Sequence, residues 1–233
     1  MKQLETRFYS LVELAEEIGR KRDGHFAERA KNDLTKWGYQ WEWLNRRGAN
    51  ILHKPETAEG KLAEFMNRYF GLDIQIHARN FAYFMLLMLT YEGFDRMPWP
   101  ERAYVLWEQF DFDVNEKTLR NWTSRLLAKD VLHKDTEKRQ YWRTFKVDGE
   151  TFREPIDAQT DEGYEMYISK RRELIDEYTS SGLSKSQAWS DAFRKLWIEF
   201  GCCYYACPSF VINLIADDVE ELLLLVSAVC AGE

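Results

Sequence analysis

Four polar residues in the segment 116–129 stand three or four positions apart: Lys117, Arg120, Asn121 and Ser124. On a helix that spacing places side chains on one face, and the leucines and the tryptophan of the segment fall on the other side. Arg and Asn can form paired hydrogen bonds with guanine and adenine edges. The segment therefore has the composition of a helix that reads bases in the major groove. A solvated helix face beside a protein core has the same pattern.

Two basic pairs lie where the sequence predicts the turns of β-hairpins. In "YQWEWLNRRGAN", aromatic and polar residues alternate with the period of a strand, and Arg46 and Arg47 follow within turn-forming residues. A second alternating segment, 131–147, carries Lys138 and Arg139 at its predicted turn. Adjacent positive charges repel one another, so we expect an anion or an acidic surface opposite each pair. Phosphate groups of a nucleic-acid backbone fit that description.

The charge of the chain is unevenly distributed. The formal net charge is −7 over 233 residues, and the last 84 residues, 150–233, contribute −9 of it. The segment 115–147, in contrast, holds nine basic and four acidic residues, a net of +5. We therefore expect any nucleic-acid contact in the middle of the chain. The acidic C-terminal third is expected to contact a protein partner.

Hydrophobic periodicity predicts a mainly α protein with two small β-hairpins. Residues 1–54 follow the order helix, helix, hairpin, and residues 55–74 form a linker helix. Residues 75–149 follow the order helix, helix, helix, hairpin, and residues 150–233 form an acidic helical C-terminal domain. The apolar segment 218–230 predicts a helix that is buried in this chain or against a copy of it.

The element order of residues 1–54 and 75–149 resembles that of winged helix-turn-helix DNA-binding proteins. The resemblance implies tandem winged-helix modules, in which one helix reads bases and each hairpin, or wing, contacts the phosphate backbone. Proteins of this kind include replication initiators of plasmids and phages and some transcription regulators. It therefore implies double-stranded DNA as the partner, bound by Arg46, Arg47, Lys117, Arg120, Asn121, Ser124, Lys138 and Arg139.

The acidic C-terminal third supports a second hypothesis from another functional class. Small acidic phage proteins that block bacterial defence nucleases, anti-CRISPR proteins among them, act by protein–protein contact through an acidic surface. On this hypothesis the paired arginines would face a protein rather than DNA. A homodimer formed through the C-terminal domain is compatible with either hypothesis.

The residue patterns give no support for an enzyme, a cofactor or a metal site. The sequence has no glycine-rich phosphate loop, and its four histidines are scattered. Cys202, Cys203 and Cys207 lack the spacing and the fourth ligand of a zinc site, so we expect thiols buried in a helical core. The longest apolar run, 81–89, is about half as long as a membrane span. We expect a protein of the reducing cytoplasm.

Overall fold

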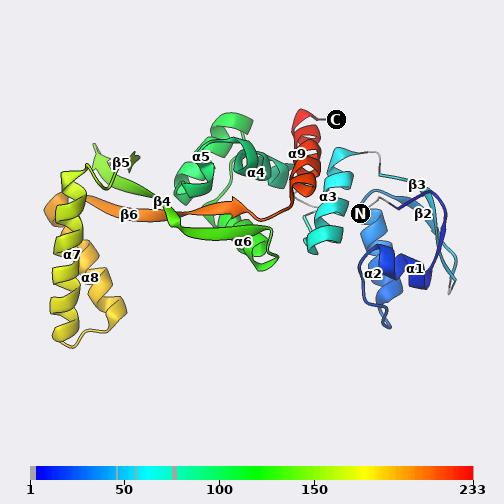
Figure 1. Cartoon of the computed structure of the whole chain (residues 1–233), viewed down its shortest axis with the longest axis horizontal. Coiled ribbons are helices and arrows are strands. Elements are labelled where there is room, and N and C mark those ends of the chain that lie inside the picture. The colour runs from blue at the N-terminus through cyan, green and yellow to red at the C-terminus, as the bar shows by residue number, and fades with distance from the viewer. Residues whose placement is uncertain (1–3, 46, 56, 75–77, 233) are drawn as a thin grey trace. The chain divides into compact units, whose positions relative to one another are not determined.

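The computed structural model describes residues 4–45, 47–55, 57–74 and 78–232, and Figure 1 labels its helices and strands. The chain divides into two compact units. The first unit comprises Met1–Phe94, Ala103–His133 and Ile212–Glu233, and the second comprises Asp95–Arg102 and Lys134–Val211. Segments that are far apart in the sequence thus build each unit, and these boundaries do not coincide with those predicted at residues 54, 74 and 149.

The N-terminal part of the first unit is a three-stranded antiparallel sheet with two helices. Its elements are β1 (Phe8–Ser10), α1 (Leu11–Glu17), α2 (Phe26–Lys36), β2 (Gln40–Trp43) and β3 (Gly48–His53). The strand order is β1-β3-β2, and Trp41 pairs with Ile51 while Trp43 pairs with Ala49. The hairpin predicted over residues 39–53 is therefore confirmed. Ser10, the last residue of β1, forms a capping box with Glu13 and so starts α1.

Hydrogen bonds between buried polar groups attach this sheet to α3 (Ala58–Phe70). The Tyr39 hydroxyl donates to Glu64 Oε1 at 2.5 Å and accepts from the backbone N–H of Leu4 at 3.0 Å. Arg68 Nη1 donates to the same Glu64 oxygen at 2.8 Å. Burial raises the pKa of Glu64, whereas its hydrogen bonds with Tyr39 and Arg68 favour the charged form. The network therefore offsets part of the cost of burying this carboxylate.

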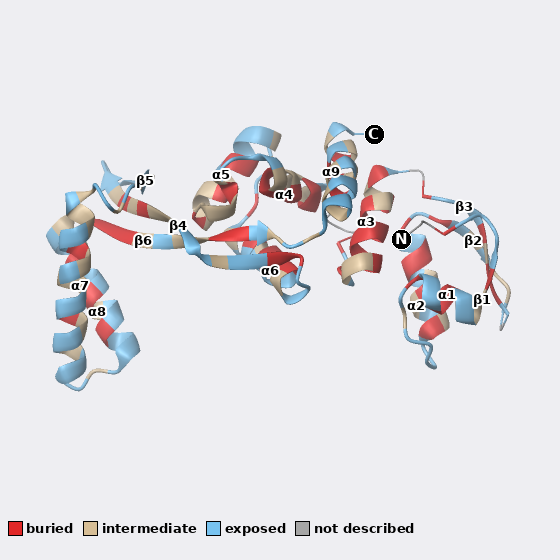
Figure 2. Cartoon of the chain, in the orientation of Figure 1, coloured by how far each residue is buried: buried red, intermediate tan, exposed pale blue. Residues whose placement is uncertain are grey.

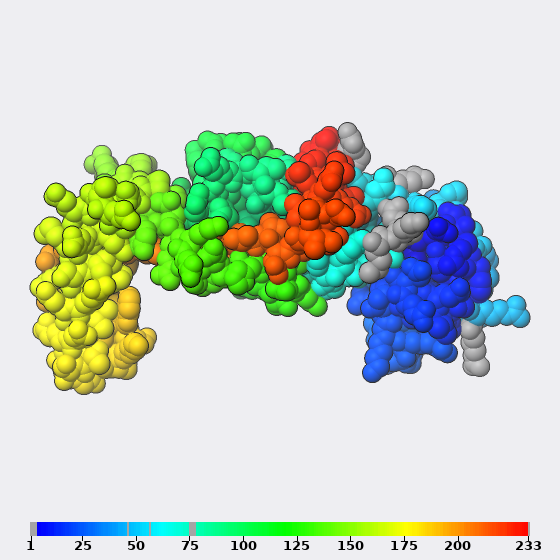
Figure 3. Space-filling model, in the orientation of Figure 1, coloured from blue at the N-terminus to red at the C-terminus, as the bar shows by residue number. Residues whose placement is uncertain are grey.

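The rest of the first unit is helical: α4 (Ala78–Thr90), most of α5 (Trp99–Phe110), α6 (Glu116–Ala128) and α9 (Ala216–Ala231). The C-terminal helix α9 packs against α3 and α4, and the space-filling view shows it directly beside α3 (Figure 3). It buries Leu222, Val226 and Val229, while Leu224 is 66% exposed. Figure 2 shows how much of α3 is buried beneath these neighbours.

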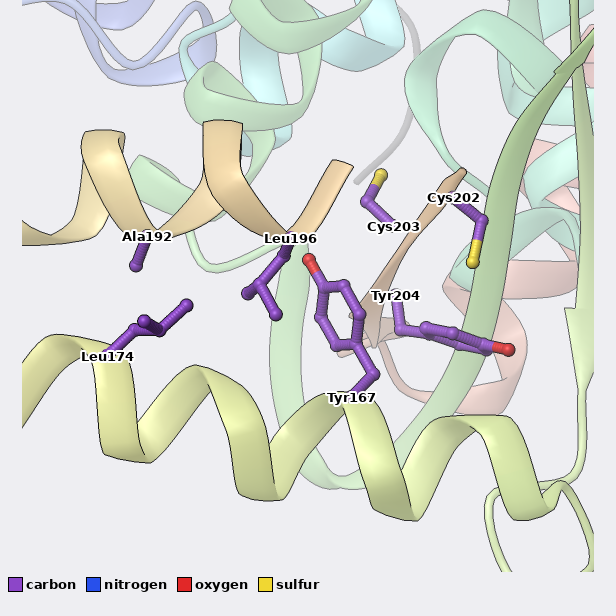
Figure 4. Packing of buried hydrophobic residues seen from close by; sticks show 7 residues of the cluster. All are labelled: Tyr167, Leu174, Ala192, Leu196, Cys202, Cys203 and Tyr204. Carbon is purple, nitrogen blue, oxygen red and sulfur yellow. The ribbon is translucent and has the colours of Figure 1, made fainter. Parts of the chain in front are cut away.

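The second unit combines a three-stranded sheet with a helical hairpin. Its strands are β4 (Leu132–Val147), β5 (Glu150–Ile156) and β6 (Cys202–Ile212), in the order β5-β4-β6, and its helices are α7 (Glu162–Ser180) and α8 (Lys185–Phe200). The core where the helices meet the sheet contains Tyr167, Leu174, Ala192, Leu196, Cys202, Cys203 and Tyr204 (Figure 4). Figure 4 shows side chains of α7, α8 and β6 converging on this core.

The predicted fold class is wrong. Helices make up 55% of the structure and strands 21%, in two three-stranded antiparallel sheets, so the chain is a mixed α and β protein. It is not a mainly α protein with tandem winged-helix modules. Residues 132–147 form one continuous strand instead of a hairpin. The region predicted as a helical C-terminal domain contains β5 and β6.

The second turn was misplaced because residues that favour a turn occur inside β4. The Asp135 carboxylate accepts hydrogen bonds from the backbone N–H groups of Glu137 and Lys138 at 2.9 and 3.1 Å, a local pattern common in turns. The chain nevertheless continues as a strand and reverses at Asp148 and Gly149, which have φ of 52° and 87°. Val147 and Glu150 close the hairpin on either side.

The described part of the chain was also searched for membrane-spanning helices. None of its helices is both long and apolar enough to cross a membrane.

Candidate nucleic-acid interface

Helix α6 starts and packs as its sequence predicts. The Asn115 side chain accepts a hydrogen bond from the backbone N–H of Thr118 at 2.9 Å and caps the helix. Trp122 points into the core, where its ring centre lies 5.8 Å from that of Phe81 and 5.7 Å from that of Phe84 on α4. These aromatic contacts fix which face of α6 is buried and leave the opposite face in solvent.

The exposed face of α6 contains all four residues that the spacing placed there: Lys117, Arg120, Asn121 and Ser124. Arg120 forms an i,i+4 ion pair with Glu116 at 2.9 Å, and the two side chains are 57% and 43% exposed. An exposed pair of this kind contributes little to stability. Arg120 can therefore exchange Glu116 for another acceptor at small cost.

Two further basic residues extend this surface toward the C-terminal end of α6. Arg125 Nη2 donates to the backbone oxygen of Asp73 at 2.7 Å. The Asp73 carboxylate pairs with Lys36 Nζ of α2 at 3.0 Å. Lys129, the C-cap of α6, approaches the same segment at Gly71. Arg125 follows Asn121 by four residues, and this helical spacing could have identified it from the sequence.

Arg46 and Arg47 were predicted to contact a nucleic acid from the tip of the first hairpin. Arg46 lies outside the described residues. Arg47 is exposed, and its backbone N–H donates to Leu44 O at 3.0 Å within the turn. Among the described residues, no hydrogen bond or ion pair joins Arg47 to the α6 face, so the structure does not unite the two predicted groups into one cluster.

Lys138 and Arg139 were predicted to form a second basic hairpin tip, which is wrong because they lie inside β4. Adjacent residues of a strand point to opposite sides of the sheet, so these two exposed side chains do not form a pair. Arg139 Nε donates to the backbone oxygen of Thr136. Both residues belong to the second unit, whereas α6 belongs to the first.

The four cysteines are free thiols. Cys202 and Cys203 are buried, but in β6 rather than in the helical core that the sequence predicted, and Cys207 and Cys230 are half-buried. Across the described ranges, no group of three or more His, Cys, Asp or Glu side chains has the arrangement of a metal site. Burial raises the pKa of both Cys207 and Cys230 to about 11, although Arg102 and Arg79, respectively, act in the opposite direction.

We therefore expect Cys207 and Cys230 to react slowly with iodoacetamide in the native protein. The thiolate is the nucleophile, and at pH 8 a thiol with a pKa of about 11 is roughly one-thousandth ionised, against roughly a quarter for an ordinary cysteine. Peptide mass spectrometry should show alkylation at least about 100-fold slower than in the urea-unfolded chain, rising about tenfold per pH unit up to pH 10. A rate that levels off below pH 9 would contradict the raised pKa values.

No protein-family model, curated protein or solved structure matches this chain. Arguments about its function therefore rest on the residues and surfaces described above.

Proposed function

We propose that this chain is a non-enzymatic protein that binds double-stranded DNA through the exposed face of α6. The observation that carries the proposal is the composition of that face. Three basic side chains of α6, Lys117, Arg120 and Arg125, lie on or beside it together with Asn121 and Ser124. The sequence of α6 contains one acidic residue, Glu116 in its first turn, so phosphate meets little repulsion there.

The proposed contacts divide into two kinds. Arg120 and Asn121, near the middle of the face, have the side chains that pair with base edges, and a major groove about 12 Å wide admits one helix. Lys117, Arg125 and Lys129 would bind phosphates and fix the position of the helix along the duplex. Arg46 and Arg47 are proposed to add phosphate contacts from the hairpin.

Lys138 and Arg139 remain proposed phosphate contacts, made individually from β4 rather than as a hairpin tip. The chain would act in the cytoplasm, as a replication initiator or a transcription regulator. Its four free thiols are compatible with a reducing compartment.

An inhibitor that acts by protein contact is the second candidate, and the outward face of α5 favours it. Tyr104 and Trp107 are 52% and 53% exposed, with ring centres 5.9 Å apart. Glu108 and Asp111, one turn further along, are also exposed. Exposed aromatic residues beside carboxylates suit a protein partner with a basic surface and disfavour phosphate.

The proposal predicts salt-dependent binding of random-sequence duplex DNA, measured by fluorescence anisotropy at several salt concentrations. Replacing both Lys117 and Arg120 with alanine should weaken binding about ten- to hundredfold and reduce the salt slope by roughly two, one unit per lost phosphate or base contact. An Arg47→Ala variant should weaken binding to all sequences alike, because phosphate contacts carry no sequence information.

The matched control replaces Lys21 and Arg22, two exposed basic residues of the loop after α1, with alanine. This variant loses the same two positive charges, so a general charge effect would appear equally in both proteins. The absence of duplex binding above background at low salt would overturn the proposal and leave protein contact as the function. Equal losses in the control would show that α6 is not the binding surface.

A further inference from the structure

Helix α8 in the second unit carries two large aromatic side chains outside its core. Trp189 and Phe193 are 45% and 48% exposed. Residues four apart on a helix are neighbours, with Cβ atoms about 5–6 Å apart. The two rings therefore form one continuous exposed surface, here named the α8 stripe.

The packing between α7 and α8 does not require the α8 stripe. Ala188, Ala192 and Leu196 of α8 are fully buried, and two of them are small enough to let the helices approach closely. Figure 4 shows Leu196 and Ala192 in the core with Leu174 and Tyr167 of α7. The hairpin thus buries one side of α8 and leaves the adjoining aromatic side in solvent.

The charged groups beside the α8 stripe are arginines. The Arg171 guanidinium of α7 lies over the Trp189 ring, 5.2 Å from its centre. Arg194 follows Phe193 directly and is 74% exposed, with a weak contact to Asp191 at 3.5 Å. On a helix with 3.6 residues per turn, Asp191 and Glu199 point roughly 160° and 120° away from Phe193. The two acidic side chains of α8 therefore face away from the α8 stripe.

We propose that the α8 stripe, with Arg171 and Arg194, is a binding surface for single-stranded nucleic acid. Unpaired bases stack on aromatic side chains whatever their sequence, and arginine contributes both phosphate contacts and stacking. Such a surface does not suit a duplex, whose bases are already stacked within the helix. A second copy docked symmetrically would bring the arginines of both copies together, and like charges at an interface are unfavourable.

The proposal goes beyond duplex binding by α6, because it concerns other residues and another form of nucleic acid. The test uses the full chain and a fluorescein-labelled oligothymidylate of about 20 nucleotides, enough for several stacked bases. A variant with Trp189→Ala and Phe193→Ala should bind it at least tenfold more weakly, since each stacked base contributes about 1–3 kcal/mol. Arg194→Glu, a surface change that leaves both rings in place, should weaken binding similarly.

Ile198→Ala is the matched control, because Ile198 is an apolar residue of α8 that is 79% exposed and lies about 140° away from Phe193 on the helix. It should leave oligothymidylate binding unchanged. The α8 stripe variants should also leave duplex binding unchanged, while the α6 variant should leave oligothymidylate binding unchanged, so the two proposals can fail separately.

Three results would overturn the proposal. The first is no oligothymidylate binding at low salt, and the second is an equal loss of binding in Ile198→Ala. The third is a change of molar mass in the α8 stripe variants, measured by light scattering, without any change in oligothymidylate binding. That result would assign the stripe to contact between copies of the chain.

Discussion

Replacement of Arg102 with alanine is expected to lower the free energy of unfolding by about 3–5 kcal/mol, as the loss of a large buried group with its hydrogen bonds does in other proteins. Arg102 is 1% exposed in the second unit. Its guanidinium lies 4.5 Å from the centre of the Trp99 ring and 5.0 Å from that of Phe210. Alanine would leave a cavity between these two rings.

Hydrogen bonds make this arginine harder to replace than its packing alone would. Nε donates to Met97 O at 3.0 Å and Nη2 donates to Asp95 O at 2.7 Å. Without them, two buried carbonyl oxygens of the turn before α5 lose a donor, which adds a desolvation cost. Burial also lowers the pKa of Arg102 to about 10, yet the side chain stays charged at neutral pH.

Urea unfolding followed by tryptophan fluorescence gives the size of this effect. Arg194→Ala, in the same unit and 74% exposed, is the control and should change stability by less than about 0.5 kcal/mol. Hydrogen exchange in β6 should accelerate in Arg102→Ala, because Phe210 on that strand loses its contact. A loss of less than about 1 kcal/mol would mean that the buried guanidinium is dispensable.

Arg102 also shows why the sequence could not predict the second unit. In "PWPERAY" it looks like an ordinary polar residue in the first turn of a helix, since it follows two prolines and a glutamate. Its partner Phe210 is more than a hundred residues away in a segment without helical or alternating periodicity. Local patterns describe the face that a residue presents but not the distant element that covers it.

The elements that sequence reasoning did predict are those determined by short-range chemistry. The start of α6 at Asn115 and its split into a buried and an exposed face follow from a capping side chain and from 3.6-residue periodicity. The first hairpin follows from period-two alternation and a turn. The second failed because a turn-like hydrogen-bond pattern at Asp135 occurs inside a strand, and because pairing with β6 depends on residues 202–212, far along the chain.

The candidate site divides in the same way. Lys117, Arg120, Asn121 and Ser124 could be grouped from the sequence because one helix carries them. The link from Arg125 to Lys36 through Asp73 could not be predicted, because it depends on how α2 and α6 approach the segment between them. The α8 stripe was also missed, since Trp189 and Phe193 fall at the same spacing as the core residues Ala192 and Leu196, and spacing alone assigns all of them to the interior.

Gly48→Ala is expected to disrupt the first sheet, with a loss of about 3 kcal/mol or more in stability, comparable to the larger effects of backbone strain and lost packing. Gly48 has φ of 151° and pairs with Ser10 at the edge where β1 meets β3. A Cβ atom there would lie 1.9 Å from the backbone oxygen of Tyr9 and 2.9 Å from its carbonyl carbon. Backbone atoms cannot rotate away as a side chain can, so one strand must move.

The consequences should extend beyond the pairing of two strands. Ser10 ends β1 and caps α1, so displacement of β1 also removes the anchor of that helix. Tyr9, which is 2% exposed, would lose its place in the core beside Ile51 of β3. We expect a lower melting temperature together with faster hydrogen exchange in β1 and α1, while exchange in the second unit stays unchanged.

Gly24→Ala is the matched control, because a Cβ added at Gly24 meets no atom within 4 Å and its φ lies outside the left-handed region. Where the backbone accepts alanine, this substitution stabilises by about 0.4–1 kcal/mol, since it restricts the unfolded chain. The two variants should therefore shift the melting temperature in opposite directions. Similar small shifts in both would mean that Gly48 acts only as a flexible residue of the hairpin turn, as the sequence alone indicated, and that the close approach of β1 to β3 is not required.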